Sequence, residues 1–125
     1  MSPSKRTANE LKYTIPGLFH PIDVHLVSRR YLNTKYRAIA KKPIPRSEIL
    51  NGFYSHEKNK IYICKELAKE RRSHTLLHEI VHMILEESAD YSEEVKCDNI
   101  GAYLLNLILD DSFRTTLNKI ENLHL

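Results

Sequence analysis

The sequence predicts a small α+β domain, in which a β-hairpin or short sheet precedes a central helix packed on a second helix and a C-terminal helix. Up to about residue 64, apolar and polar residues alternate between turn signals, which is typical of strands. Beyond that point the apolar residues recur every three or four positions, which is typical of helices. The 125 residues, 42% of them hydrophobic and 28% charged, suffice for one globular core and leave no room for a second domain of ordinary size.

The N-terminal region is expected to begin with a flexible segment. Residues 1–12 are polar, so the folded domain is predicted to span residues 13–125. Two turn signals, Pro16-Gly17 and His20-Pro21, mark a loop before the alternating run Ile22–Val27.

The next segment, Val24–Ala40, is ambiguous. It could form one helix, or a helix followed by a strand, and Pro43-Ile44-Pro45 must end it. After it, residues 51–55 and 60–64 alternate on either side of His56–Asn59, and this pattern predicts a β-hairpin.

Three helices are predicted after the hairpin. Ser73 could cap the first, whose apolar residues cover most of its circumference, as expected of a central buried helix. The second runs over Val95–Leu109 with Ser92 as a candidate cap, and the third begins at Asp111 or Ser112.

The central helix carries the one segment whose residue pattern indicates a specific chemical function, His78-Glu79-Ile80-Val81-His82. Residues four apart share a helical face, so both imidazoles can reach one metal ion with Glu79 beside it. This is the layout of a zinc hydrolase, and Zn²⁺ is the cofactor it predicts. Iron, manganese or nickel would also suit two histidines and a carboxylate.

A catalytic zinc generally takes three protein ligands and leaves one position for water, so a third group must come from elsewhere. The acidic segment Asp90–Asp98 opens the second helix, and a carboxylate there could complete the site.

These residues resemble the gluzincin class of metallopeptidases. The resemblance implies that a glutamate on the following helix is the third zinc ligand and that an aspartate four residues later supports a ligating histidine. Glu94 and Asp98 match this spacing, whereas Cys97 stands four residues after Glu93. More narrowly, the stretch from about Asn51 to Asp111 is similar to small metallopeptidase-like proteins of phages and mobile elements, related in layout to the ImmA/IrrE group. It departs from that group in having Ile100-Gly101-Ala102 where an alanine-rich segment is common.

The chemistry implied is hydrolysis of a peptide bond in a protein or peptide substrate, with Glu79 as the general base. The resemblance adds regulatory proteins to the candidate substrates. The hairpin edge could hold that substrate as an added strand, or the N-terminal segment could cover it. A donor for the tetrahedral oxyanion is not fixed. Tyr91, before the second helix, and His74, one turn before His78, are the nearest candidates.

Three other interpretations stand beside the peptidase. The histidines could be ordinary polar residues of a buried helix. A structural zinc site usually needs four Cys or His ligands, and this chain has two cysteines on separate elements. The strongest rival is a metal-binding regulatory or interaction module that keeps a peptidase fold and cleaves little or nothing. An intact Glu79 favours catalysis, because a pure metal scaffold needs no general base.

Charge and composition limit the setting. Residues 1–50 include ten basic and three acidic residues. Such an excess of positive charge could bind nucleic acid or an acidic protein, but more often it belongs to a solvated surface. No apolar run is long enough to span a bilayer and the N-terminus lacks an apolar signal core, so a cytoplasmic protein without membrane contact is expected. In that compartment Cys64 and Cys97 are expected to stay as thiols. Nothing in the sequence sets the oligomeric state.

Overall fold

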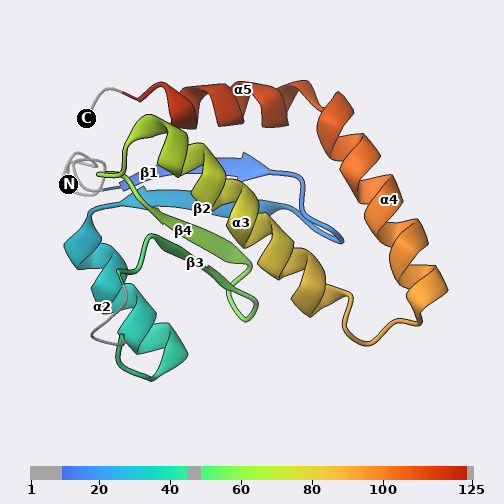
Figure 1. Cartoon of the computed structure of the whole chain (residues 1–125), viewed down its shortest axis with the longest axis horizontal. Coiled ribbons are helices and arrows are strands. Elements are labelled where there is room, and N and C mark those ends of the chain that lie inside the picture. The colour runs from blue at the N-terminus through green and yellow to red at the C-terminus, as the bar shows by residue number, and fades with distance from the viewer. Residues whose placement is uncertain (1–9, 45–48, 124–125) are drawn as a thin grey trace, which may run out of the picture.

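A computed structural model describes residues 10–44 and 49–123 and has the predicted α+β architecture (Figure 1). A four-stranded sheet is combined with helices. In chain order the elements are β1 (Glu10–Ile15), β2 (Ile22–Val27), α2 (Arg29–Ala40), β3 (Gly52–Ser55), β4 (Lys60–Cys64), α3 (Lys69–Glu87), α4 (Glu93–Leu109) and α5 (Asp111–Glu121).

The sheet has the strand order β1-β2-β4-β3. Its two central strands, β2 and β4, are parallel, and the crossover between them includes α2, as a parallel pair requires. The predicted hairpin is confirmed, because β3 pairs antiparallel with β4 and Gly52 lies opposite Ile63. β3 is therefore an edge strand.

The two faces of the sheet carry separate hydrophobic clusters. On one face, α3 packs against β3 and β4 and α5 packs against β1, with Ile61, Ile63 and Leu76 fully buried. On the other face, α2 covers a smaller cluster that includes Leu32, Phe53 and Tyr62. Tyr62 stacks on Phe53 with ring centroids 4.9 Å apart and so packs within this cluster.

The start of the chain differs from the expectation in two places. The predicted flexible end includes Glu10–Lys12, but these residues belong to β1 and pair with β2, whereas residues 1–9 lie outside the described residues. The segment Val24–Ala40 is neither a single helix nor a helix followed by a strand. It is a strand to Val27 and then a helix, because the Ser28 side chain accepts a hydrogen bond from the backbone N–H of Tyr31 and caps α2.

The helix α3 begins earlier than its predicted cap. Lys69 is its first residue and Ala68 precedes it, so Ser73 lies inside the helix. The Ser73 hydroxyl lies 3.3 Å from the carbonyl oxygen of Lys69 and 3.2 Å from Glu121 Oε1 of α5, and these two oxygens share its one proton as acceptors. Ser73 therefore helps to join α3 to α5.

The apolar circumference of α3 is only partly buried. Its sheet-facing side packs in the core, but Leu77, Val81 and Leu85 on the outer side are 44, 52 and 62% exposed. The helix is thus covered on one face, and its outer face is open.

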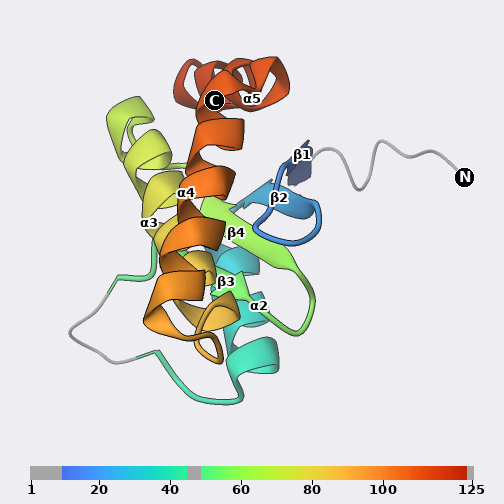
Figure 2. The same ribbon diagram turned by 90° about the vertical axis from the view of Figure 1, so that its right-hand side faces the viewer.

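The predicted packing of α3 on the second helix is not what the structure has. α3 packs on the sheet and α5, whereas α4 stands apart from α3, on the same side of the sheet and beyond the end of its strands (Figures 1 and 2). The α4 helix reaches the core through Tyr103 and Leu107. Its predicted cap is confirmed, since the Ser92 side chain accepts from the N–H of Val95.

Both cysteines are free thiols, Cys64 buried and Cys97 exposed. Within residues 10–44 and 49–123, no helix combines the length and apolar character needed to cross a membrane.

Candidate metal centre

The two histidines of the motif converge on an exposed side of α3. Their Nε2 atoms are 3.1 Å apart and their ring centroids 4.8 Å apart. Two nitrogens that each bind one tetrahedral zinc at about 2.0–2.1 Å lie about 3.3 Å from each other. His78 and His82 therefore have the chemistry and the spacing of two ligands of a single metal ion.

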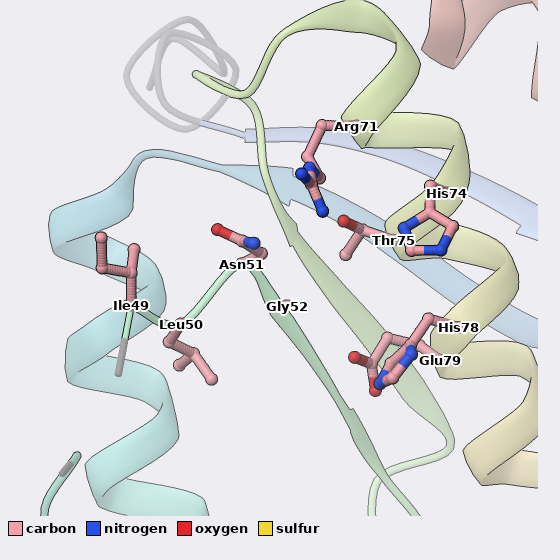
Figure 3. Close-up of a pocket in the computed structure, with 9 residues that line it drawn as sticks. All are labelled: Ile49, Leu50, Asn51, Gly52, Arg71, His74, Thr75, His78 and Glu79. Atoms are coloured by element: carbon pink, nitrogen blue, oxygen red, sulfur yellow. The ribbon is translucent and has the colours of Figure 1, made fainter. Parts of the chain in front are cut away.

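Glu79 points towards β3, with its carboxylate beside the His78 ring (Figure 3). It is only 6% exposed, and this burial raises the pKa of its carboxyl group from 4.5 to about 7. The backbone N–H of Tyr54 bonds to the carboxylate and opposes that rise, while the nearby Glu86 adds to it. The carboxyl group can therefore exchange a proton near neutral pH.

A groove runs between β3 and α3, past His78 and Glu79. It consists of a cavity of about 280 Å³ and another of about 450 Å³, and both are lined by Leu50, Gly52, His78 and Glu79. The smaller part continues towards the start of α3 (Figure 3), and the larger part continues past His82 and Glu86.

The edge of β3 faces this groove. The Cys64 N–H bonds to the Asn51 carbonyl, so these two residues form a hydrogen-bonded pair between β4 and β3. In an antiparallel pair, every second residue bonds to the partner strand, and the backbone N–H and C=O groups of Gly52 and Tyr54 therefore point to the free edge. A Cβ atom at residue 52 would lie 2.6 Å from the Tyr62 carbonyl oxygen and 2.8 Å from Thr75 Cγ2. Glycine is thus what allows the strand and α3 to approach so closely.

The third predicted ligand is not beside the histidines. Glu94 and Asp98 lie in the first two turns of α4 and are exposed. Across the part of the chain that the structure describes, no three His, Cys, Asp or Glu side chains form a group that could hold a metal ion. His78 and His82 thus supply two nitrogen ligands of the kind that zinc binds. The roles of Glu94 and Asp98 stay predictions.

The two candidate oxyanion donors differ in position. His74 lines the smaller cavity, with its ring centroid 6.5 Å from that of His78. Tyr91 lines neither part of the groove, and its ring lies 5.7 Å from that of Phe19. Of the two, only His74 belongs to the groove.

Several groove residues were not found from the sequence. Glu86 lies one turn after His82 and lines the larger cavity, which the spacing of four could have indicated. The Tyr54 hydroxyl donates to Glu87 Oε2 at 3.1 Å, and burial with the neighbouring Glu87 carboxylate raises its pKa above the ordinary 10. No sequence pattern links Tyr54 to Glu87.

Comparisons with protein-family models, with curated proteins and with solved structures give no match for this chain. The interpretation of the site therefore depends on its own residues and geometry.

Replacing Glu79 with glutamine should stabilise the metal-free protein at high pH but not at low pH. In the wild type, the folded state binds the Glu79 proton more tightly than the unfolded state does. The contribution of this proton to wild-type stability is therefore complete below pH 4.5 and is lost as the pH rises to about 7. Relative to the wild type, Glu79→Gln should gain about 2–3 kcal/mol in unfolding free energy above about pH 7.5. Urea unfolding with a chelator present measures this, with the exposed Glu70→Gln as control. A difference that does not change with pH would contradict the prediction.

Proposed function

We propose that this protein is a zinc-dependent peptidase, which binds an extended peptide along the edge of β3 and hydrolyses one of its peptide bonds. One observation carries the proposal. Two imidazole nitrogens 3.1 Å apart and a buried carboxyl group lie on one helix, at a groove beside a free strand edge. This combination supplies two metal ligands, a proton carrier and a peptide-binding surface.

His78 and His82 would hold the metal through Nε2, and Glu94 is the third ligand we propose. Zinc supplies a Lewis acid that polarises a carbonyl group and brings the pKa of a water molecule near neutrality. Asp98, one turn after Glu94, would accept the ring N–H of a ligating histidine.

The protein residues then move the proton. Glu79 takes it from the attacking water at its carboxylate and delivers it to the leaving amine nitrogen. The Tyr54 N–H bonded to this carboxylate keeps it oriented at the groove. His74 is the donor we propose for the oxyanion, because its ring lines the groove beside His78.

The strand edge offers the means to hold the substrate. The N–H of Tyr54 is engaged with Glu79, but the backbone groups of Gly52 also face the free edge. A peptide that adds as a further strand would bond to them through its main chain, so the scissile carbonyl group would lie against α3.

Delivery of Glu94 requires α4 to approach α3, and two open apolar surfaces support such a movement. The outer face of α3 exposes Leu77, Val81 and Leu85, and α4 exposes Leu105 and Ile108 on the same helical face as Glu94 and Asp98. Packing these surfaces together would remove apolar area from water while bringing the carboxylate to the histidines.

A second candidate function is a metal-binding regulatory or interaction module without catalysis. The separation of Glu94 from the histidines favours it, because the ligand set of a catalytic zinc is not assembled in the described residues.

The variant Glu79→Gln separates the two functions. A peptidase should keep its zinc but lose cleavage by about 100-fold or more, because the amide cannot carry the proton. Elemental mass spectrometry measures the metal, and mass spectrometry of a proteome-derived peptide mixture measures cleavage. Glu70→Gln, on the same helix but outside the groove, is the matched control. If wild-type protein loaded with zinc cleaves nothing, or if Glu79→Gln cleaves as well as the wild type, the peptidase proposal is wrong.

Glu94→Gln should weaken zinc binding by about 10–100-fold in a competition titration with a zinc chelator. Its neighbour Glu93→Gln is the control, since the Glu93 carboxylate pairs with Lys96 on the surface and should bind no metal. Equal losses of affinity in the two variants, or a larger loss for Glu93→Gln, would refute the ligand assignment.

A further inference from the structure

The end of the groove near the start of α3 contains a guanidinium group that none of the other described residues neutralises. Arg71 lines the smaller cavity together with Asn51, Thr75 and His74. Figure 3 shows its guanidinium pointing from α3 towards Asn51 and Thr75, inside the cavity. Within residues 10–44 and 49–123, the ion pairs found leave Arg71 without a carboxylate partner.

We infer that Arg71 binds a carboxylate of the substrate peptide, so that the protein selects peptides with an acidic group on one side of the scissile bond. The selection of substrates for cleavage rests on the proposed peptidase function. The binding of a carboxylate by Arg71 rests only on the residues that line the cavity.

The other arginines near this part of the fold are already occupied. Arg29 donates to the Leu50 carbonyl through Nη1 and to Asn51 Oδ1 through Nη2, the latter at 3.4 Å. Arg72 is buried and donates to the Leu123 carbonyl at 2.9 Å. Arg71 alone among these three is left for a ligand from outside.

Its neighbours add hydrogen-bond donors. Because Arg29 holds Asn51 Oδ1, the amide nitrogen of Asn51 is on the side of the cavity, as Figure 3 shows. The Thr75 hydroxyl and the His74 ring also line this end. A carboxylate there would accept charge-assisted hydrogen bonds from a planar guanidinium and further bonds from neutral donors.

The opposite end of the groove lacks this character. The larger cavity is lined by Glu86 as well as Lys42, so its charges are mixed. Selection for an acidic group should therefore act on one side of the scissile bond only.

The position of Arg71 also sets the distance to that bond. Seven residues separate it from His78 on α3, which corresponds to about 10 Å along a helix. An extended peptide covers about 10 Å in three residues. The acidic group should lie within about three residues of the scissile bond, either as an Asp or Glu side chain or as a free C-terminal carboxylate.

The test is binding of short fluorescent peptides to the zinc-loaded Glu79→Gln protein, which removes turnover. Matched peptides carry Glu or Gln at successive positions, each with a free or an amidated C-terminus. We expect about 10-fold tighter binding for a carboxylate at the preferred position. The comparison of free with amidated peptides identifies a side chain or the chain end as its source. In the Arg71→Gln background the preference should fall below about 2-fold, and in Arg71→Lys it should be partly retained.

Arg30→Gln, which removes one positive charge from α2, controls for general electrostatic attraction and should keep the full preference. Equal binding of Glu and Gln peptides, a preference that survives Arg71→Gln, or equal losses in Arg71→Gln and Arg30→Gln would overturn the inference. Acid-selective binding that depends on Arg71, in a protein whose wild type cleaves none of these peptides, would support the binding site while contradicting the peptidase. Cleavage without acid selectivity would do the reverse.

Discussion

The packing of one face of α3 on the central strands is the interaction on which the rest of the structure depends. Leu76, Ile80 and Met83 are buried against the strands, and a helix with 3.6 residues per turn then has only one orientation. In that orientation Glu79 reaches the edge strand and shares the groove with His78 and His82, whose nitrogens lie together. The core thus brings the two imidazoles and the carboxyl group of the motif to one groove beside the strand edge.

The α4 helix buries the least of its apolar surface. Its second half is largely apolar, yet the helix contributes only Tyr103 and Leu107 to the buried core, and residues such as Leu105 and Ile108 are exposed. Contiguous exposed apolar surface usually marks a place where another surface packs. The outer face of α3 is open in the same way and lies beside the histidines. If Glu94 is the third ligand, as proposed, metal binding and the packing of α4 would support each other, since Glu94 can reach the histidines only together with its helix.

Local patterns could predict those parts of the fold that depend on local physics. The hairpin followed from alternation around a turn, the start of α4 from Ser92, and the meeting of His78 with His82 from their spacing of four. The predicted start of α3 is wrong, because Ser73 is a good cap by type but bonds to α5, whereas the helix begins after Ala68 without a side-chain cap. The position of α4 and the convergence of Arg71 with Asn51 depend on contacts between segments far apart in the chain, and no periodicity carries that information.

The most direct test of the account is the metal content of the purified protein by elemental mass spectrometry, beside a His78→Ala, His82→Ala double variant. The account predicts about one zinc per chain in the wild type and none in the variant. A wild type that stays free of metal after zinc is offered would contradict it. The two rings 3.1 Å apart would then be a hydrogen-bonded pair on the surface of α3 and not a metal centre.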